Sequence, residues 1–303
     1  MAGTTLTSLA GRLASQEALI AATREIFQIS DIAHRYAEAE SAQGASIVVP
    51  LFNVPTAKAF APPTTNYMST DGTVSGVPIN LDMHYFQGFK FADIDFAQCP
   101  VGFWKGAGEA IGKALGKAIA GNVVGLINKA NVPKSATNEK VLAAADKKAI
   151  AALTVAAEDA DFDPAKATLL LSGKLFSELC AVMDANVYGG PEAVRAGSLA
   201  PGCYGFGRIR RCNALSTATG ENLTGAILSD DALGYACAPL EPQGKAGLDE
   251  YGFATDQASG LTIGFRRFAD NANGTNYMVG EVLMGAKLLQ PTKVVRLVSA
   301  ATA

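Results

Sequence analysis

The segment that most constrains the fold is a long alternation of apolar and polar residues at positions 77–91. This period of two predicts a β-strand with one buried face, interrupted only by Gln87 on the apolar side and Phe86 on the polar side. The apolar side carries Val77, Ile79, Leu81, Met83, Tyr85, Phe89 and Phe91, and the polar side carries Asn80, Asp82, His84 and Lys90.

A strand of this length constrains the shape of the subunit. Its fifteen residues, at about 3.3 Å each, would extend for roughly 50 Å, whereas strands in compact domains have about three to ten residues. The strand is therefore expected to project as an arm or to run along the molecule. Residues 46–54 predict a second strand, and the Pro-, Thr- and Gly-rich residues 55–76 predict a loop between the two.

Residues 101–129 show a helical period instead. Lys105, Glu109, Lys113 and Lys117 form a charged row with four-residue spacing, which makes Lys113 the expected partner of Glu109. Glycine inside a helix costs about 1 kcal/mol relative to alanine, so the helix must be held by packing. The four-residue spacing of the glycines predicts a groove that another backbone approaches closely. These glycines are Gly108, Gly112, Gly116, Gly121 and Gly125.

Two stretches resemble nucleotide-binding motifs but lack essential residues. A phosphate-binding loop ending at Gly112-Lys113 would need glycine and a hydroxyl residue where Ala107 and Ala114 stand. The dinucleotide-binding pattern fails as well, because Ile111 occupies the place of its third glycine. The stretch 172–174 follows a predicted strand without the upstream glycine, and Ser172 is expected to be a helix N-cap.

The remaining segments predict a mixed α+β chain. Residues 7–40 are expected to be helical with a break near Ser30 and Asp31, either of which could cap a second segment. Residues 138–157 predict a helix, and 166–171 predict a strand followed by a helix from Ser172, which indicates a second domain of α/β type. A strand and a short helix are expected within 225–237, then two strands around an Asn/Gly turn and a last strand after Pro291.

Composition restricts the class of protein. With 49% hydrophobic and 17% charged residues, the 303-residue chain is not disordered, and a net charge of -3 disfavours a dedicated nucleic-acid binder. The five cysteines have no C-x-x-C spacing, which favours buried, reduced thiols in a cytoplasm over disulfides or zinc. The start of the chain does not resemble a signal peptide, and we expect no membrane span.

No residue pattern predicts an enzyme. The only histidines are His34, expected on the first helix, and His84, expected on the polar side of the long strand, and no G-x-S-x-G motif occurs. The carboxylates Asp93 and Asp95 share one face of a strand, and helix or turn capping is their expected role. We therefore predict no catalytic, cofactor-binding or metal-ligating residue and no cofactor.

The succession of segments resembles the major capsid proteins of tailed bacteriophages, which have the Hong Kong 97-like fold. The resemblance extends over nearly the whole chain and rests on order and spacing. Its elements are an N-terminal arm, the alternating stretch INLDMHYFQGFKFADIDF and a long Ala/Gly helix, followed by LLLSGKLFSEL, EAVRAGSL, GFGRI, ENLTGAILSDDALGYA and VGEVLMGAKLLQPTKVVRL.

The resemblance implies a division of the chain. Residues 1–45 would form the N-terminal arm, 46–92 the extended loop with its long β-hairpin, and 93–135 the peripheral domain with its spine helix. Residues 136–258 would form the axial domain, and strands in 259–303 would complete the peripheral and axial domains.

The resemblance also implies a function. The protein would assemble with itself, as hexamers and pentamers, into an icosahedral head shell around double-stranded DNA, with only non-specific contact to that DNA. A scaffolding protein, a portal and decoration proteins would be its partners, without a membrane. It would be located in the virion after assembly in the host cytoplasm. The alternative is an encapsulin-type shell of the same fold that encloses protein cargo.

Some members of this family link neighbouring subunits through an isopeptide bond between a loop lysine and an asparagine, assisted by a glutamate. The matching positions here would be Lys58 for the lysine and Glu281 for the glutamate. Asn273 and Asn276 flank the expected position of the asparagine, so the register differs from the family pattern. Lys58 is equally well interpreted as a solvated loop residue.

Overall fold

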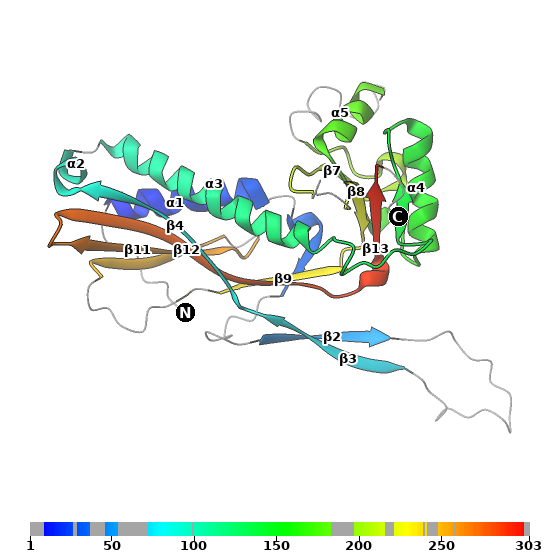
Figure 1. Ribbon diagram of the computed structural model, residues 1–303, viewed down its shortest axis with the longest axis horizontal. Coiled ribbons are helices and arrows are strands. Elements are labelled where there is room, and N and C mark those ends of the chain that lie inside the picture. The colour runs from blue at the N-terminus through cyan, green and yellow to red at the C-terminus, as the bar shows by residue number, and fades with distance from the viewer. Residues whose placement is uncertain are drawn as a thin grey trace.

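The computed structural model describes residues 9–26, 29–36, 46–53, 72–98, 100–182, 197–215, 221–238, 240, 248–256 and 259–299. The fold is α+β, as expected. An elongated lobe combines a six-stranded sheet with two long helices, and a second lobe at one end contains a five-stranded sheet (Figure 1). A two-stranded hairpin, β2 (Ser46–Asn53) with β3 (Thr73–Asn80), extends away from both lobes.

The six-stranded sheet is organised around its longest strand, β12 (Thr275–Leu288). The first part of β12 pairs antiparallel with β4 (Met83–Ala92), and its last part pairs antiparallel with β9 (Leu233–Ala238). Strand β12 also pairs antiparallel with β11 (Thr262–Asp270), which in turn pairs with β10 (Glu250–Thr255), a strand that the sequence pattern did not predict. The short β1 (Ala33–Arg35) completes the sheet, parallel to β9.

The alternating segment forms two strands instead of the single strand predicted for 77–91. Its alternation of burial is as expected, but the chain changes sheets at Leu81 and Asp82: β3 pairs with β2, and β4 pairs with β12. Leu81 is buried in a cluster with Val49 and Ile79, which fixes the crossing point. Residues 73–76 belong to β3, so the predicted loop was too long at its C-terminal end, and 54–71 lie outside the described residues.

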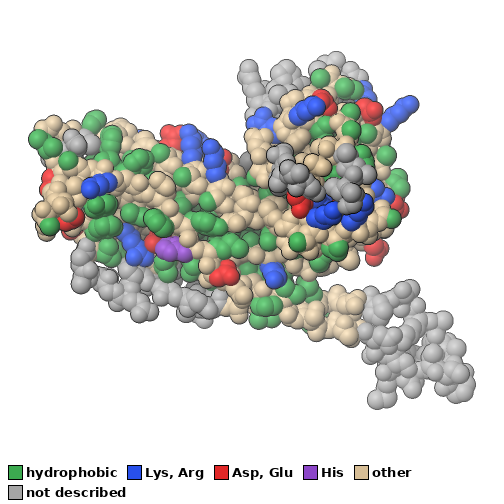
Figure 2. Space-filling view, in the orientation of Figure 1, with side chains coloured by type: hydrophobic (Ala, Val, Ile, Leu, Met, Phe, Trp, Pro, Cys, Tyr) green, Lys and Arg blue, Asp and Glu red, His purple; other side chains and the backbone are tan. Residues whose placement is uncertain are grey.

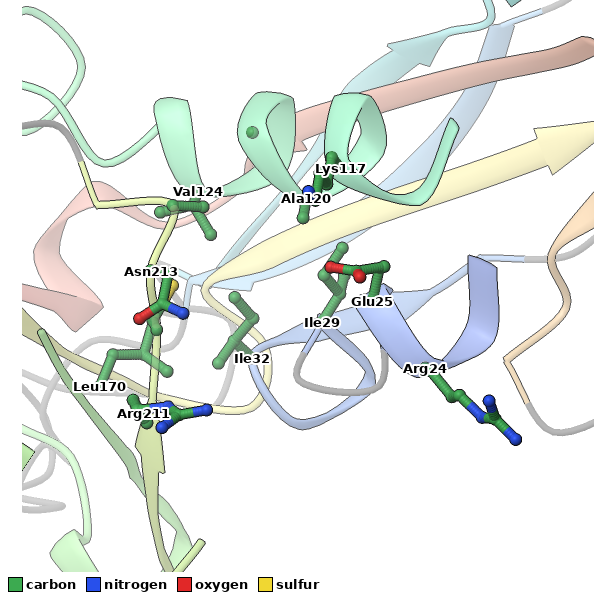
Figure 3. A pocket seen from close by; sticks show the side chains of 13 residues that line it. Arg24, Glu25, Ile29, Ile32, Lys117, Ala120, Val124, Leu170, Arg211 and Asn213 are labelled. Carbon is green, nitrogen blue, oxygen red and sulfur yellow. The ribbon is translucent and has the colours of Figure 1, made fainter. Parts of the chain in front are cut away.

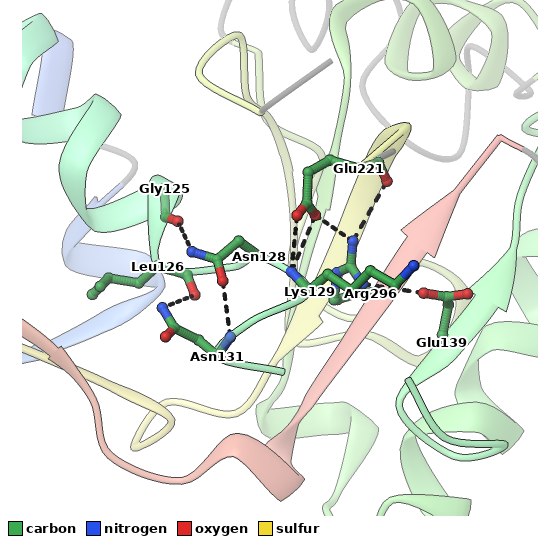
Figure 4. Close-up of polar contacts among 8 residues, drawn as sticks. All are labelled: Gly125, Leu126, Asn128, Lys129, Asn131, Glu139, Glu221 and Arg296. Carbon is green, nitrogen blue, oxygen red and sulfur yellow. Dashed lines mark hydrogen bonds and ion pairs between the residues drawn. The ribbon is translucent and has the colours of Figure 1, made fainter. Parts of the chain in front are cut away.

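Helix α3 (Val101–Gly125) covers one face of the six-stranded sheet, and α1 (Leu9–Ile26) runs beside it (Figure 1). Ile111, Leu115 and Ile119 of α3 are buried, as the helical period predicted. The helix ends at Gly125, earlier than the predicted 129. The Asn128 side chain donates to the carbonyl of Gly125 and that of Asn131 to the carbonyl of Leu126, which replaces a further helical turn (Figure 4).

The prediction of a second helical segment after Ser30 was wrong. After α1, a 3-10 turn at Ile29–Asp31 leads into β1, because pairing with β9 satisfies the backbone of 33–35. Asp31 does not cap a helix; its carboxylate lies 2.6 Å from Nε of Arg210 and 3.3 Å from Nη1 of Arg208. His34 is consequently an exposed strand residue rather than a helical one.

The second sheet has the order β5 (Glu139–Val141), β13 (Val294–Val298), β8 (Leu223–Leu228), β6 (Thr168–Leu171) and β7 (Arg208–Arg211). It packs with α4 (Lys147–Asp159) and α5 (Gly173–Val182) around buried residues such as Leu169, Phe176 and Phe206. The last strand of the chain, β13, thus belongs to this sheet, whereas the preceding β12 belongs to the larger one.

Several predicted boundaries in this lobe were wrong. The helix expected from 138 begins at 147, because 139–141 pair with β13 and Asp146 accepts a hydrogen bond from the amide of Ala149. The strand expected from 166 begins at Thr168, after a 3-10 turn at Pro164–Lys166. The short helix expected near 229–232 is a turn that leads into β9. Ser172 lies before α5, and its Oγ accepts from the amide of Leu175 at 3.5 Å.

Candidate functional site

The two lysines of the nucleotide-like motifs form local ion pairs with glutamates. Nζ of Lys113 lies 2.7 Å from Oε1 of Glu109, which confirms the predicted pairing along α3. Nζ of Lys174 lies 3.9 Å from Oε1 of Glu178 on α5. Gly112 is buried against α1, so its backbone is not available to surround a phosphate. Neither stretch is arranged as a nucleotide site.

His84 and Glu281, outside these motifs, form ion pairs on the larger sheet. Nε2 of His84 lies 3.1 Å from Oε2 of the buried Glu281, whose Oε1 lies 2.5 Å from Nε of Arg266. Among the residues that the structure describes, no group of three or more His, Cys, Asp or Glu side chains could hold a metal ion. Burial raises the pKa values of Cys180, Cys203, Cys212 and Cys237, the last to about 12, so these thiols stay neutral and weakly nucleophilic.

The candidate cross-linking residues that the structure describes do not come together within one chain. Asn276 and Glu281 are five positions apart on β12, so their side chains leave opposite faces of the sheet. Asn276 donates to Asp93 at 2.6 Å, and Asn273 donates to Asp270 at 2.6 Å in the turn before β12. Asp93 begins the short helix α2 (Asp93–Gln98). Lys58 and the side chain of Asp95 lie outside the described residues.

The glycines of α3 form a close helix–helix contact. A Cβ atom at Gly108 or Gly112 would overlap the backbone of Ala14 or Ala18 on α1, and one at Gly116 would lie 2.8 Å from Cβ of Glu25. The groove predicted from the glycine spacing is therefore confirmed for these three positions. It is wrong for Gly121 and Gly125, where a Cβ would meet no atom of the described residues within 4 Å.

The partner surface on α1 was not predicted. The helical period of 7–40 favours a stripe of large apolar residues that includes Leu13 and either Leu19 or Ile20; Leu19 packs against the core, whereas Ile20 is 44% exposed. The buried face is made of Ala14, Ala18, Ala21 and Ala22. Their four-residue spacing mirrors that of the glycines and is the sequence signal that could have revealed this contact.

The β2–β3 hairpin has an exposed apolar outer face. Val48, Phe52 and Val74 are 60%, 73% and 64% exposed. The cross-strand pairs Val48 with Pro78, Pro50 with Gly76 and Phe52 with Val74 make this part of the face apolar, and the polar pair Ser46 with Asn80 ends it at the base of the hairpin. The opposite face is anchored on the larger lobe through the buried Val49 and Ile79. A contiguous exposed apolar surface of this kind is typical of a protein–protein contact.

A buried ion network joins the end of α3 to the second sheet (Figure 4). Arg296 on β13 is fully buried, with Nη1 3.1 Å from Oε2 of Glu139 and Nη2 2.5 Å from Oε2 of Glu221. The carboxylate of Glu221 also accepts from the amide of Lys129, just beyond α3. Sequence reasoning missed Arg296, although a lone charge inside the apolar run VVRLV is a recognisable signal.

The face of the molecule seen in Figure 2 carries charges of both signs. Figure 2 shows basic and acidic side chains scattered over the visible face without a large area of one sign. Within the described ranges, no helix is both long and apolar enough to cross a membrane. These features are consistent with the mild net charge of the chain.

Comparison with known proteins identifies the fold. The sequence matches no protein-family model and no curated protein. A capsid structure of the cyanophage P-SCSP1u aligns with a TM-score of 0.57 and 16% identity, covering 91% of this chain and 88% of the other. This chain has a capsid fold. The resemblance inferred from the sequence is thereby confirmed at the level of the fold.

Two further structures share this capsid fold. A chain of Mycobacterium phage Che8 aligns with a TM-score of 0.51 and 15% identity, covering 98% of this chain and 93% of the other. The virus-like particle from Pyrococcus furiosus aligns with a TM-score of 0.54 and 13% identity, covering 96% of this chain and 100% of the other. Almost the entire described chain therefore takes part in the capsid fold.

Proposed function

We propose that this protein is the major capsid protein of a tailed phage, which assembles with itself into an icosahedral shell around double-stranded DNA. The observation that carries the proposal is the capsid fold, aligned over 91% of the chain with the capsid structure of a cyanophage. The role is structural. It is supported by the local ion pairs of Lys113, Lys174 and His84, residues of the kind that a nucleotide-dependent or acid–base enzyme would use.

The proposal assigns a role to each region. Residues 1–45 are the N-terminal arm, 46–92 the extended loop, 93–135 the peripheral domain with α3 as its spine helix, 136–258 the axial domain, and 259–303 the closing strands of both domains. The outer face of the hairpin lies on a neighbouring subunit of the lattice. Its exposed Val48, Phe52 and Val74 support this role, because nothing in the described chain covers them.

The partners and location follow from the same proposal. Neighbouring copies form hexamers and pentamers, and contacts with scaffolding, portal and decoration proteins complete the head. Contact with the packaged DNA is non-specific, as the scattered charges of Figure 2 favour. Assembly takes place in the host cytoplasm, and the final location is the virion. Cross-linking through Lys58 is not part of this proposal.

The alternative is an encapsulin-type compartment, a shell of the same fold around protein cargo. The alignment with the virus-like particle from Pyrococcus furiosus, which covers all of that chain, supports considering it. The phage assignment is preferred because structures from several phages, including the cyanophage P-SCSP1u and Che8, align over most of both chains. The two shells differ in their contents.

Electron microscopy of native particles, with nuclease-protected nucleic acid measured alongside, tests the proposal. The expected result is icosahedral shells that protect double-stranded DNA. Shells filled with a protein and free of DNA would establish the encapsulin-type alternative. Small discrete oligomers without shells would exclude both and favour a globular binding module or enzyme.

A further inference from the structure

A cavity of about 710 Å³ lies where the end of α1, α3 and the end of β7 meet (Figure 3). Its apolar floor includes Ile29, Ile32, Val124 and Leu170, each at most 4% exposed. Leu170 lies on β6 of the second sheet, whereas Val124 lies on α3 of the elongated lobe. The cavity is thus formed by the contact between the two lobes.

The polar lining of this cavity is predominantly basic. Among the described residues it includes Arg24, Lys117 and Arg211, with Glu25 as the single acidic residue. Figure 3 shows Glu25 opposite Lys117, Arg211 beneath Ile32, and the guanidinium of Arg24 directed outward. Within the described part of the chain, none of the three cations lies in an ion pair, and the buried Nε of Arg211 has no hydrogen-bond partner. The cavity therefore combines an apolar hollow with unneutralised positive charge.

We propose that this cavity binds an acidic amphipathic segment of a partner protein. An aliphatic or aromatic side chain would fill the hollow over Ile32 and Val124, while neighbouring carboxylates would pair with Lys117 and Arg211. Charge complementarity supports this choice, because the lining has three cations and one anion while the chain as a whole has a net charge of -3.

Nucleic acid fits the same cavity less well. Single-stranded nucleic acid is held by aromatic stacking together with a basic groove that follows the backbone. Among the described residues the lining contains no aromatic side chain, and its most buried members are aliphatic, so a phosphate there would lose hydration without gaining a partner. The occupant favoured by these observations therefore carries an apolar side chain beside its carboxylates. This inference goes beyond the proposed function and can be tested on the unassembled subunit.

The test uses the full-length unassembled subunit and two fluorescein-labelled helical peptides. One peptide combines leucine with glutamate, and the other has lysine at every glutamate position. Fluorescence anisotropy is expected to show the acidic peptide binding at least about tenfold more tightly. Two variants probe the cavity: Lys117→Glu reverses a charge at its wall, and Ala120→Trp fills the hollow without changing charge. Each should weaken binding of the acidic peptide by about tenfold or more.

Lys105→Glu is the matched control, because it reverses an exposed charge on the same helix outside the cavity lining. It should bind the acidic peptide like the unmodified protein, and thermal unfolding should show that every variant is folded. Equal binding of both peptides, no binding of either, or unchanged binding by Lys117→Glu and Ala120→Trp would overturn the proposal. Displacement of the acidic peptide by a single-stranded oligonucleotide at equal concentration would overturn it in favour of nucleic acid.

Discussion

At the scale of single residues, Arg296 is the charged side chain with the largest structural consequence. It is fully buried between two carboxylates, and one of these, Glu221, also holds the amide of Lys129 at the end of the α3 region. The network therefore connects the elongated lobe to the second sheet. Removing one member would leave buried charge without a partner, which costs more than the pair itself contributes.

Arg296→Met is expected to lower the free energy of unfolding by about 3 to 5 kcal/mol, because Glu139 and Glu221 lose their shared cation. Urea denaturation measures the change. Lys293→Met removes a half-exposed ion pair with Asp231 and should cost less than about 1 kcal/mol. Adding Glu139→Gln and Glu221→Gln to Arg296→Met should restore part of the lost unfolding free energy. Equal stability of Arg296→Met and Lys293→Met would contradict this account.

The raised pKa of Tyr235 leads us to expect a loss of stability at alkaline pH. Burial is the main cause that raises its pKa from 10.0 to about 12, and its hydroxyl donates to the carbonyl of Ser259. The folded state therefore favours the neutral phenol. The resulting stabilisation is complete below pH 10, the pKa of the unfolded chain, and is lost as the pH rises towards 12.

Tyr235→Phe should therefore flatten the decline of unfolding free energy above pH 10, although it also removes the hydrogen bond to Ser259 and lowers stability at neutral pH. Urea denaturation at a series of pH values measures the slope. Tyr277→Phe, at a less buried tyrosine, serves as the control for removing a phenol hydroxyl elsewhere in the protein. A slope that is the same for Tyr235→Phe and the unmodified protein would show that Tyr235 does not contribute.

At the scale of secondary-structure elements, the contact between α1 and α3 depends on small residues on both helices. Ala14, Ala18 and Ala22 face Gly108, Gly112 and Gly116, so the two backbones approach closely. The glycines that lie outside this contact gain nothing from lacking a side chain. The same helix therefore contains an internal comparison between glycines required by packing and glycines that only reduce helix stability.

Gly112→Ala is expected to destabilise the protein by about 1 to 3 kcal/mol, because its Cβ would overlap the backbone of Ala18. Gly121→Ala should instead stabilise it by about 1 kcal/mol, since a Cβ there meets nothing within 4 Å and alanine is the better helix former. Thermal and urea unfolding of both variants measure the difference. Stabilisation by Gly112→Ala would show that the two helices are not in close contact.

At the scale of the whole molecule, the projecting hairpin uses one face for folding of the subunit and has another face available for assembly. Its inner face packs on the elongated lobe through Val49 and Ile79, whereas its outer face is exposed and apolar. A change to the outer face should therefore leave the subunit folded. If the protein forms a shell as proposed, the same change should prevent contact with the neighbouring copy.

Phe52→Asp combined with Val74→Asp should give soluble subunits with an unchanged melting temperature that no longer form particles. Both side chains are more than half exposed, so little native packing is lost, but a buried charge would oppose the contact between copies. Light scattering and electron microscopy measure assembly. Val155→Asp, at an equally exposed valine on α4, is the control and should assemble normally. Particles in normal yield from the double variant would refute the role of this face.

The sequence alone determined the features that depend on local periodicity. The alternation at 77–91 and the helical spacing at 101–129 predicted which side chains are buried, because the geometry of a strand or helix places them on one face. The glycine spacing predicted a close backbone contact, and the lack of complete motifs argued against a nucleotide site. The order of segments along the chain was sufficient for the resemblance to the capsid fold, which the structural comparison confirmed.

Only the tertiary structure decided the features that depend on partners distant in the sequence. Strands β1 and β5 form where the sequence predicted helix, because pairing with β9 and β13 satisfies their backbones better than a short helix would. The division of the long strand at Leu81, the alanine face of α1 and the burial of Arg296 likewise require neighbours brought together by folding. The local sequence pattern determines whether a segment favours a helix or a strand. Long-range packing energy determines which other elements it contacts.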